Sequence, residues 1–194
     1  MRLPIIQPDG EYLLGGLLLT FGLIGFLIYK HPKNLDKVGS IDNLVVFRIV
    51  SRGINMQTLA STIIRCETEM AKNPLFKYLI EVVTDEARVN LPVNKDNITQ
   101  IKVPQDYETP NKSLFKARAL HYALYNSAAP DNAWIIHLDE ETQPTSSGIK
   151  GISKMIKEEE ESKAFRIGQG ALLYHREWKK YPILTGVKIL LFIF

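Results

Sequence analysis

Two carboxylates separated by one residue, Asp139 and Glu141, are the sharpest chemical feature of this 194-residue sequence. They follow the apolar run 134–138 (WIIHL), which is typical of a buried strand. Carboxylate oxygens in this arrangement can hold a hard divalent cation such as Mg²⁺ or Mn²⁺, usually shared with the phosphate oxygens of a ligand. An acidic turn that leads into the next helix is the competing interpretation, and the residues alone leave both open.

Other side chains could join such a site. Lys116 and Arg118, in the run KARAL of a predicted helix, could reach a diphosphate, although the residues alone favour a solvated basic helix face. His137 and Asp139 form a His-x-Asp pair like that of a metal-dependent hydrolase, but no second histidine has ligand spacing to it. We therefore expect His137 to be an inward or hydrogen-bonded strand residue. Cys66 lies on the apolar face of a predicted helix, which favours core packing over nucleophilic catalysis.

Alternating strands and helices must position these residues. The apolar patterns predict strands at 44–50, 78–84, 101–103, 134–138 and 166–174, and helices at about 57–70, 112–125 and 146–161. Apolar strands separated by helices predict an α/β fold with a mostly parallel sheet covered on both faces. In such folds, ligands bind beyond the carboxyl ends of the strands. Those ends are Ser51-Arg52-Gly53, Thr84-Asp85-Glu86 and Asp139-Glu140-Glu141.

The composition is that of an ordinary globular protein, with 45% hydrophobic and 23% charged residues. It excludes a disordered chain, a collagen-like repeat and a polytopic membrane protein. The net charge of +3 is not concentrated in any segment, so nucleic acid is not an expected partner. A single cysteine permits no intrachain disulfide, which excludes a secreted disulfide scaffold.

The segment 12–29 (YLLGGLLLTFGLIGFLIY) contains no charged residue. As a helix it would be about 27 Å long, close to the roughly 30 Å hydrocarbon core of a bilayer. The region before it carries only Arg2 as a basic residue, which favours an uncleaved anchor over a signal peptide. Lys30, Lys33 and Lys37 follow it, so the positive-inside rule predicts a single-pass membrane protein whose body faces the cytosol. We expect an N-terminal tail at 1–11, the anchor at 12–29 and a linker at 30–43.

Five segments carry a resemblance to a known family. RIVSRGINMQTL, KYLIEVVTD, LFKARALHYAL, WIIHLDEET and RIGQGALLYH occur in that order. Together they resemble the nucleotide-sugar-binding half of the inverting family 2 glycosyltransferases, which have a GT-A (Rossmann-like) fold. The resemblance is strongest to the egghead-type β-1,4-mannosyltransferases, membrane enzymes that extend the glycolipid glucosylceramide from GDP-mannose. It covers about residues 44–178 and implies a location in the endomembranes (endoplasmic reticulum or Golgi).

The resemblance implies a role for six residues. Asp139 and Glu141 match the D-x-D-like motif that binds the divalent cation (Mn²⁺ or Mg²⁺) and the donor diphosphate. Asp85 matches the acidic region near the base and ribose, and Lys116 matches a lysine that contacts the diphosphate. The loop Ser51-Arg52 matches the loop that lines the nucleotide pocket. A cation at such a site would offset charge on the leaving diphosphate.

The sequence also departs from the family pattern. An inverting transferase needs a general base for the acceptor hydroxyl, which the family supplies from an Asp in a later E-D-like motif, followed by a Q-x-x-R-W motif. These 194 residues contain neither motif, and the resemblance stops at Trp178. We therefore assign no catalytic base and expect a partial transferase domain at 44–178 with a divergent apolar tail at 179–194. Two functions stay open: a membrane-bound mannosyltransferase, or a truncated isoform that binds nucleotide sugar or a protein partner without turnover.

Overall fold

The computed structural model describes residues 34–85, 91 and 96–162, together with Thr20 and Gly168. Apart from those last two positions, the described residues belong to one compact unit, Asn34–Arg166. Except for Thr20 and Gly168, the predicted anchor at 12–29, the predicted strand at 166–174 and the tail at 179–194 lie outside the described residues. In the part of the chain that is described, no helix combines the length and apolar character needed to cross a membrane.

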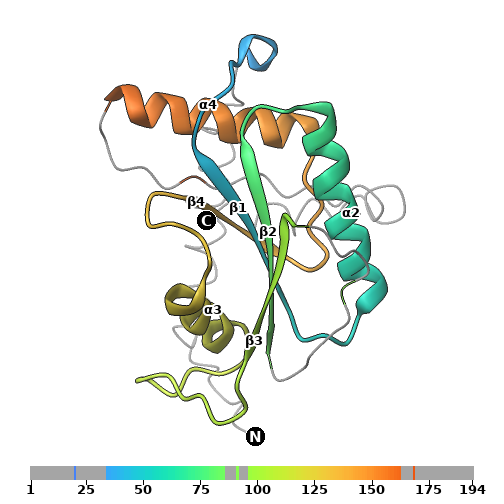
Figure 1. The fold of residues 1–194 in the computed structure, drawn as a ribbon, viewed down its shortest axis with the longest axis vertical. Helices are drawn as coiled ribbons and strands as arrows, with labels where there is room; N and C mark the ends of the chain where they lie inside the picture. The colour runs from blue at the N-terminus through green and yellow to red at the C-terminus, as the bar shows by residue number, and fades with distance from the viewer. Residues whose placement is uncertain (1–19, 21–33, 86–90, 92–95, 163–167, 169–194) are drawn as a thin grey trace, which may run out of the picture. The chain divides into compact units, whose positions relative to one another are not determined.

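A four-stranded parallel sheet forms the centre of this unit (Figure 1). Its strands lie in the order β3-β2-β1-β4. In chain order the elements are the 3₁₀ turn η1 (Leu35–Lys37), β1 (Leu44–Ser51), α2 (Met56–Lys72), β2 (Lys77–Asp85), β3 (Ile98–Val103), α3 (Phe115–Asn126), β4 (Trp134–Asp139) and α4 (Ser146–Ser162). The predicted α/β architecture with a mostly parallel sheet and flanking helices is confirmed.

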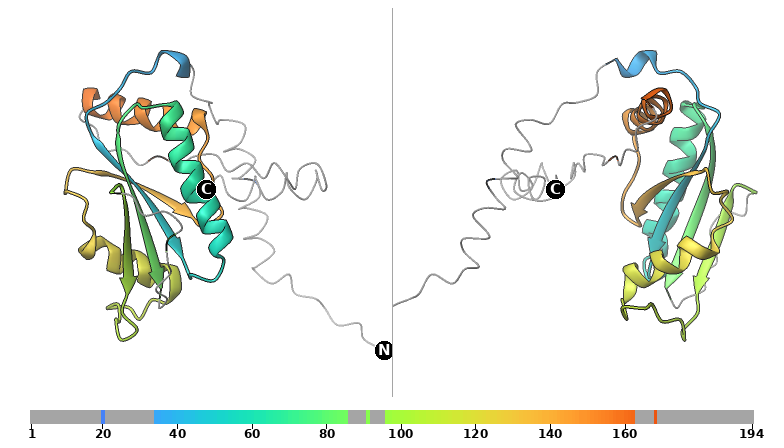
Figure 2. Two further views of the ribbon diagram at one scale, coloured as in Figure 1. Left: turned by 45° about the vertical axis from the view of Figure 1, so that its right-hand side comes forward. Right: turned by 90° about the vertical axis from the view of Figure 1, so that its left-hand side faces the viewer.

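Helices cover both faces of the sheet (Figure 2). Alternate residues of β1 point to opposite faces, as the pleat of a strand requires. Phe47 and Ile49 pack in the larger core with the apolar sides of α2 and α4, which contribute Leu59, Ile63 and Ile156 among others. On the opposite face, the smaller core joins residues of three strands to Ala119 and Ala123 of α3. The alanines leave room for α3 to lie close to the sheet.

The two helices on the larger core lie where the sequence predicts them. Asn55 caps α2, because its side-chain oxygen accepts a hydrogen bond from the backbone N–H of Thr58 at 3.3 Å. Cys66 is fully buried in this core, and burial raises the pKa of its thiol to about 12. It is therefore a packing residue, as expected. Helix α4 begins at Ser146 and includes the acidic run at 158–161.

Two predicted boundaries differ from the structure. Strand β3 begins at Ile98, three residues before the predicted start, because it pairs with β2 from Ile80↔Ile98 to Asp85↔Val103. Helix α3 begins at Phe115 rather than at Lys112. Both Lys112 and Phe115 have φ of 52°, in the left-handed region, so a regular helix cannot run through Lys112.

Candidate functional site

Three strand ends meet at the carboxyl edge of the sheet. The parallel register aligns Ser51 with Thr84, and Val50 with Asp139, so β1, β2 and β4 finish side by side. The loops that follow form a pocket of about 330 Å³. The residues that line it are Val50, Ser51, Arg52, Asp85, Lys116, Asp139, Glu140 and Glu141. The structure thus brings all six residues selected from the sequence to one pocket, although it does not test the roles given to them.

Lys116 and Asp139 form an ion pair across this pocket. Lys116 comes from the first turn of α3 and Asp139 is the last residue of β4, and the Lys116 Nζ contacts the Asp139 Oδ1. Both side chains are about half exposed, at 50% and 47%. A pair this exposed stabilises the fold by only about 0–1 kcal/mol. Its ammonium can therefore move to an anionic ligand at little energetic cost.

Asp85 has a different environment, because it is buried against Arg118 of α3. The Arg118 Nε and Nη2 donate to the Asp85 Oδ1 at 3.0 and 2.6 Å. The Nη1 of the same guanidinium donates to the carbonyl oxygens of Gln105 and Tyr107 at 3.2 and 3.3 Å. Arg118 is only 7% exposed, so the idea of a solvated basic face is wrong for this residue. Its bonds hold Asp85 in place at the pocket wall and fix the loop that follows β3.

Glu140 connects the loops that follow β1 and β4, although no role for it was predicted from the sequence. Its carboxylate accepts a hydrogen bond from Ser51 Oγ, and its backbone carbonyl accepts one from Thr62 Oγ1 at 2.6 Å. Ser51 Oγ in turn accepts a bond from the N–H of Gly53 at 2.9 Å, where φ is 73° and glycine is favoured. Only its place between Asp139 and Glu141 could have drawn attention to Glu140.

The donor atoms of the pocket fit a hard divalent cation. Asp139 and Glu141 supply carboxylate oxygens, and among the lining residues four carboxylates stand against the two cationic side chains, Arg52 and Lys116. Magnesium is usually held by one or two carboxylates together with substrate phosphates. Within the described ranges, no group of three or more His, Cys, Asp or Glu side chains is placed to hold a metal. A cation held by Asp139 and Glu141 would take its other ligands from water or from a bound phosphate.

His137 lies on β4 beside this site but takes a different position from the one expected. Its side chain is exposed rather than inward, and the register places it next to Arg48 of β1. Partial desolvation lowers the pKa of His137, and the positive charges of Arg48 and Lys116 lower it further. A neutral imidazole is favoured, but the hydrolase-like ligand set is not present among the described residues.

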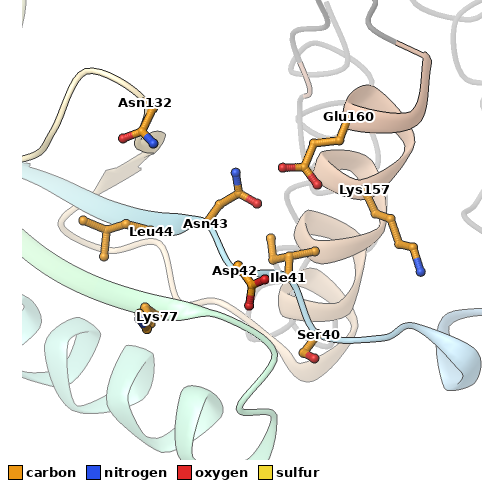
Figure 3. A pocket seen from close by; sticks show the side chains of 9 residues that line it. All are labelled: Ser40, Ile41, Asp42, Asn43, Leu44, Lys77, Asn132, Lys157 and Glu160. Atoms are coloured by element: carbon orange, nitrogen blue, oxygen red, sulfur yellow. The ribbon is translucent and has the colours of Figure 1, made fainter.

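A second cavity of about 570 Å³ lies at the opposite, amino edge of the sheet (Figure 3). It is bounded by the segment that enters β1, by the starts of β2 and β4, and by the end of α4. Asp42, Lys77, Lys157 and Glu160 line it and are all exposed. In Figure 3, Glu160 points from α4 towards Asn43, whereas Lys157 points away from it. Exposed charges of both signs, pointing in different directions, indicate no particular ligand.

Comparison with known proteins identifies relatives of the chain. It is 33% identical over 164 residues to the β-1,4-mannosyltransferase egh of Drosophila melanogaster, and the aligned residues cover 82% of this chain. It is 34% identical over 157 residues, 79% of the chain, to the β-1,4-mannosyltransferase bre-3 of Caenorhabditis elegans and to its namesake in Caenorhabditis briggsae. The chain is a homologue of the egghead-type β-1,4-mannosyltransferases. The resemblance found from the sequence is therefore confirmed.

The relationship covers only part of these relatives. The chain spans about a third of their length, 35% of the Drosophila protein and 33% of each Caenorhabditis protein. No protein-family model matches the chain, and no solved structure matches it. The homology thus identifies the chain as glycosyltransferase-like, and what the pocket binds must be argued from its residues.

Proposed function

We propose that the chain provides the donor site of a β-1,4-mannosyltransferase and binds GDP-mannose together with Mn²⁺ or Mg²⁺. The observation that carries this proposal is the meeting of six separately selected residues at one pocket on the carboxyl edge of a parallel sheet. Such edges are where α/β folds bind nucleotides. The names of the homologues supply the sugar and the linkage.

Each side chain has a task that suits its position. Asp139 and Glu141 would hold the divalent cation, which when bound offsets the charge that develops on the leaving diphosphate. Lys116 would leave Asp139 and donate to the phosphate oxygens, since its present pair is weak and exposed. Asp85, fixed by Arg118, would accept hydrogen bonds from the base or ribose of the nucleotide. Ser51 would keep the β1 loop in place through Glu140.

The transfer step goes beyond the donor site. We propose that the whole protein adopts a GT-A fold of family 2, inverts the sugar configuration and transfers mannose to a glycolipid such as glucosylceramide. The pocket residues described above bind and orient the donor, and we assign none of them as the general base. Formation of a mannosylated lipid from radiolabelled GDP-mannose and glucosylceramide is the test of this wider proposal.

The proposal includes a membrane location. The uncharged segment 12–29 would anchor the protein in an endomembrane, with the body in the cytosol. The sequons at Asn97 and Asn111 make the orientation testable, since they would be glycosylated only in a lumen. We expect no change in mass when the cell-derived protein is treated with a deglycosylating enzyme. A loss of mass would contradict the cytosolic orientation.

Calorimetric titration of GDP-mannose tests the donor site. We expect binding by the 194-residue chain in the presence of Mn²⁺ and loss of the metal-dependent part in Asp139→Ala and Glu141→Ala. Glu161→Ala removes an exposed carboxylate of α4 that does not line the pocket and is the matched control. Binding that is unchanged in both pocket variants would refute the assignment of the cation ligands.

A further inference from the structure

An exposed aromatic ring lies beside the mouth of this pocket. Phe115 is the first residue of α3 and is 58% exposed. It immediately precedes Lys116, which lines the pocket. The guanidinium carbon of Arg52, another lining residue, lies 5.3 Å from the centre of the Phe115 ring. The ring is therefore next to two lining residues: Lys116 follows it in the chain, and the guanidinium of Arg52 lies over it.

The protein interior does not explain this ring. Phe115 belongs to neither of the two hydrophobic cores identified among the described residues. Its φ of 52° is a conformation that bulky side chains avoid. Unfavourable backbone conformations of this kind concentrate where a side chain must be held for a ligand. An exposed phenyl group in such a conformation gains little for the folded state, so its position needs a reason outside the core.

We propose that the Phe115 ring is the stacking platform for the base of the bound nucleotide, and that Arg52 leaves the ring for the diphosphate when the nucleotide binds. This inference rests on the proposed donor site. In the free chain the guanidinium covers the ring through a cation–π contact, which is weak at an exposed position. A bound nucleotide offers both groups a better partner, since the phosphates attract Arg52 and the base has a flat face for the ring.

Phe115 and its neighbour Lys116 then recognise different parts of the nucleotide. Lys116 and Arg52 contact the diphosphate by charge, whereas Phe115 contacts the base by stacking. Because every base has a flat aromatic face, stacking distinguishes a nucleotide from bare diphosphate without choosing between bases. The platform therefore predicts that the chain prefers nucleoside diphosphates to inorganic diphosphate.

Calorimetry with two ligands separates the two contributions. GDP and inorganic diphosphate are each titrated, with Mn²⁺, into the full chain and into Phe115→Leu, Phe115→Trp and Tyr125→Leu. Leucine keeps the apolar bulk but has no aromatic face, and tryptophan keeps the face. Tyr125 is also an exposed ring, at 71% against 58% for Phe115, and lies near the other end of α3. It packs on His121 and does not line the pocket, so its variant is the matched control.

We expect Phe115→Leu to bind GDP roughly 5- to 150-fold more weakly than the wild type, the range measured for loss of one base-stacking contact. Its affinity for inorganic diphosphate should stay the same. Phe115→Trp should retain GDP binding, and Tyr125→Leu should bind both ligands as the wild type does. Equal weakening of both ligands by Phe115→Leu, or unchanged GDP binding, would overturn the stacking role.

Two further measurements decide the outcome if a variant does not fold or if the wild type does not bind. If Phe115→Leu does not fold, as judged by its circular dichroism, the fluorescence of Phe115→Trp measured against the wild type takes its place. Quenching by GDP but not by diphosphate supports stacking, and an unchanged signal overturns it. A wild-type chain that binds neither ligand refutes the proposed donor site itself. A wild-type chain that binds GDP and inorganic diphosphate equally well supports the phosphate site but refutes the stacking role of Phe115.

Discussion

Arg118 and Lys116 lie two residues apart on α3, yet their surroundings differ sharply. The guanidinium of Arg118 is buried against Asp85, whereas the ammonium of Lys116 forms a half-exposed pair with Asp139. Their charges are the same, so charge alone does not indicate which of them is available to a ligand. The buried one fixes the pocket wall, and the exposed one can change partner.

Replacing Arg118 with glutamine should destabilise the protein strongly. The change leaves the buried Asp85 carboxylate without its charged partner, which costs about 3–5 kcal/mol in comparable cases. Urea unfolding followed by circular dichroism measures the loss. Lys150→Gln is the control, because Lys150 pairs with a fully exposed Asp36 and such pairs contribute about 0–1 kcal/mol. An Arg118→Gln variant as stable as this control would show that the Asp85 pair does not hold the pocket wall.

Replacing Lys116 with alanine should weaken ligand binding while leaving the fold intact. A hydrogen bond to a charged group contributes about 1.5–3 kcal/mol, so we expect GDP to bind roughly 10- to 150-fold more weakly. The free energy of unfolding should change by no more than about 1 kcal/mol, because the pair with Asp139 is exposed. Titration and urea unfolding of the same variant check both statements. Unchanged affinity would exclude Lys116 from the phosphate contacts.

The sequence predicted six of the eight residues that line the pocket, but not the partners that hold them. Ser51, Asp85 and Asp139 were found because each ends an apolar run, and strand ends of a parallel sheet converge. The Asp85–Arg118 pair joins residues 33 positions apart, and no local pattern encodes it. Phe115 was missed because it lies within the predicted helix 112–125, whose pattern shows neither its left-handed φ nor its exposure.

Among the elements, the strands and the two helices on the larger core were the most predictable. Helix α2 alternates apolar and polar positions at the helical period and begins at a capping asparagine, and its predicted span of 57–70 lies within Met56–Lys72. Strand β3 was predicted too short because Thr99 and Gln100 interrupt its apolar pattern, and its pairing with β2 extends it. Tertiary pairing overrides local propensity at such edges.

Glu69 joins α2 to the start of α4 and makes their packing sensitive to acid. Its carboxylate is buried and accepts a hydrogen bond from Ser146 Oγ at 2.5 Å and one from Lys72 Nζ at 3.0 Å. The bond from Ser146, followed by that from Lys72, lowers the pKa of Glu69 below its ordinary value. The stabilisation is therefore complete above that ordinary value and is lost as the pH falls through it towards the lower folded-state pKa.

Glu69→Gln should remove this pH dependence. We expect the variant to be less stable than the wild type at pH 7 and the two to converge as the pH falls below about 4, because protonation abolishes the charge in the wild type as well. Urea unfolding at a series of pH values measures the two profiles. Glu161→Gln, an exposed carboxylate at the end of α4, should follow the wild type throughout. Parallel profiles for Glu69→Gln and the wild type would contradict the role of Glu69.

For the molecule as a whole, the described unit places its charged and polar pocket at the carboxyl edge of the sheet. Its strands all run in the same direction, so every loop that follows a strand contributes to the same edge. The chain corresponds to about a third of its mannosyltransferase relatives. The proposed donor binding can be measured separately from product formation.

The location of a bound nucleotide is the most direct test of the proposed donor site. Crystals of the chain grown with GDP and Mn²⁺ allow the metal to be placed by its anomalous scattering. We predict the Mn²⁺ between Asp139, Glu141 and the diphosphate, within the pocket of about 330 Å³ at the carboxyl edge of the sheet. A nucleotide bound instead in the cavity at the amino edge, or a metal that contacts neither carboxylate, would contradict it.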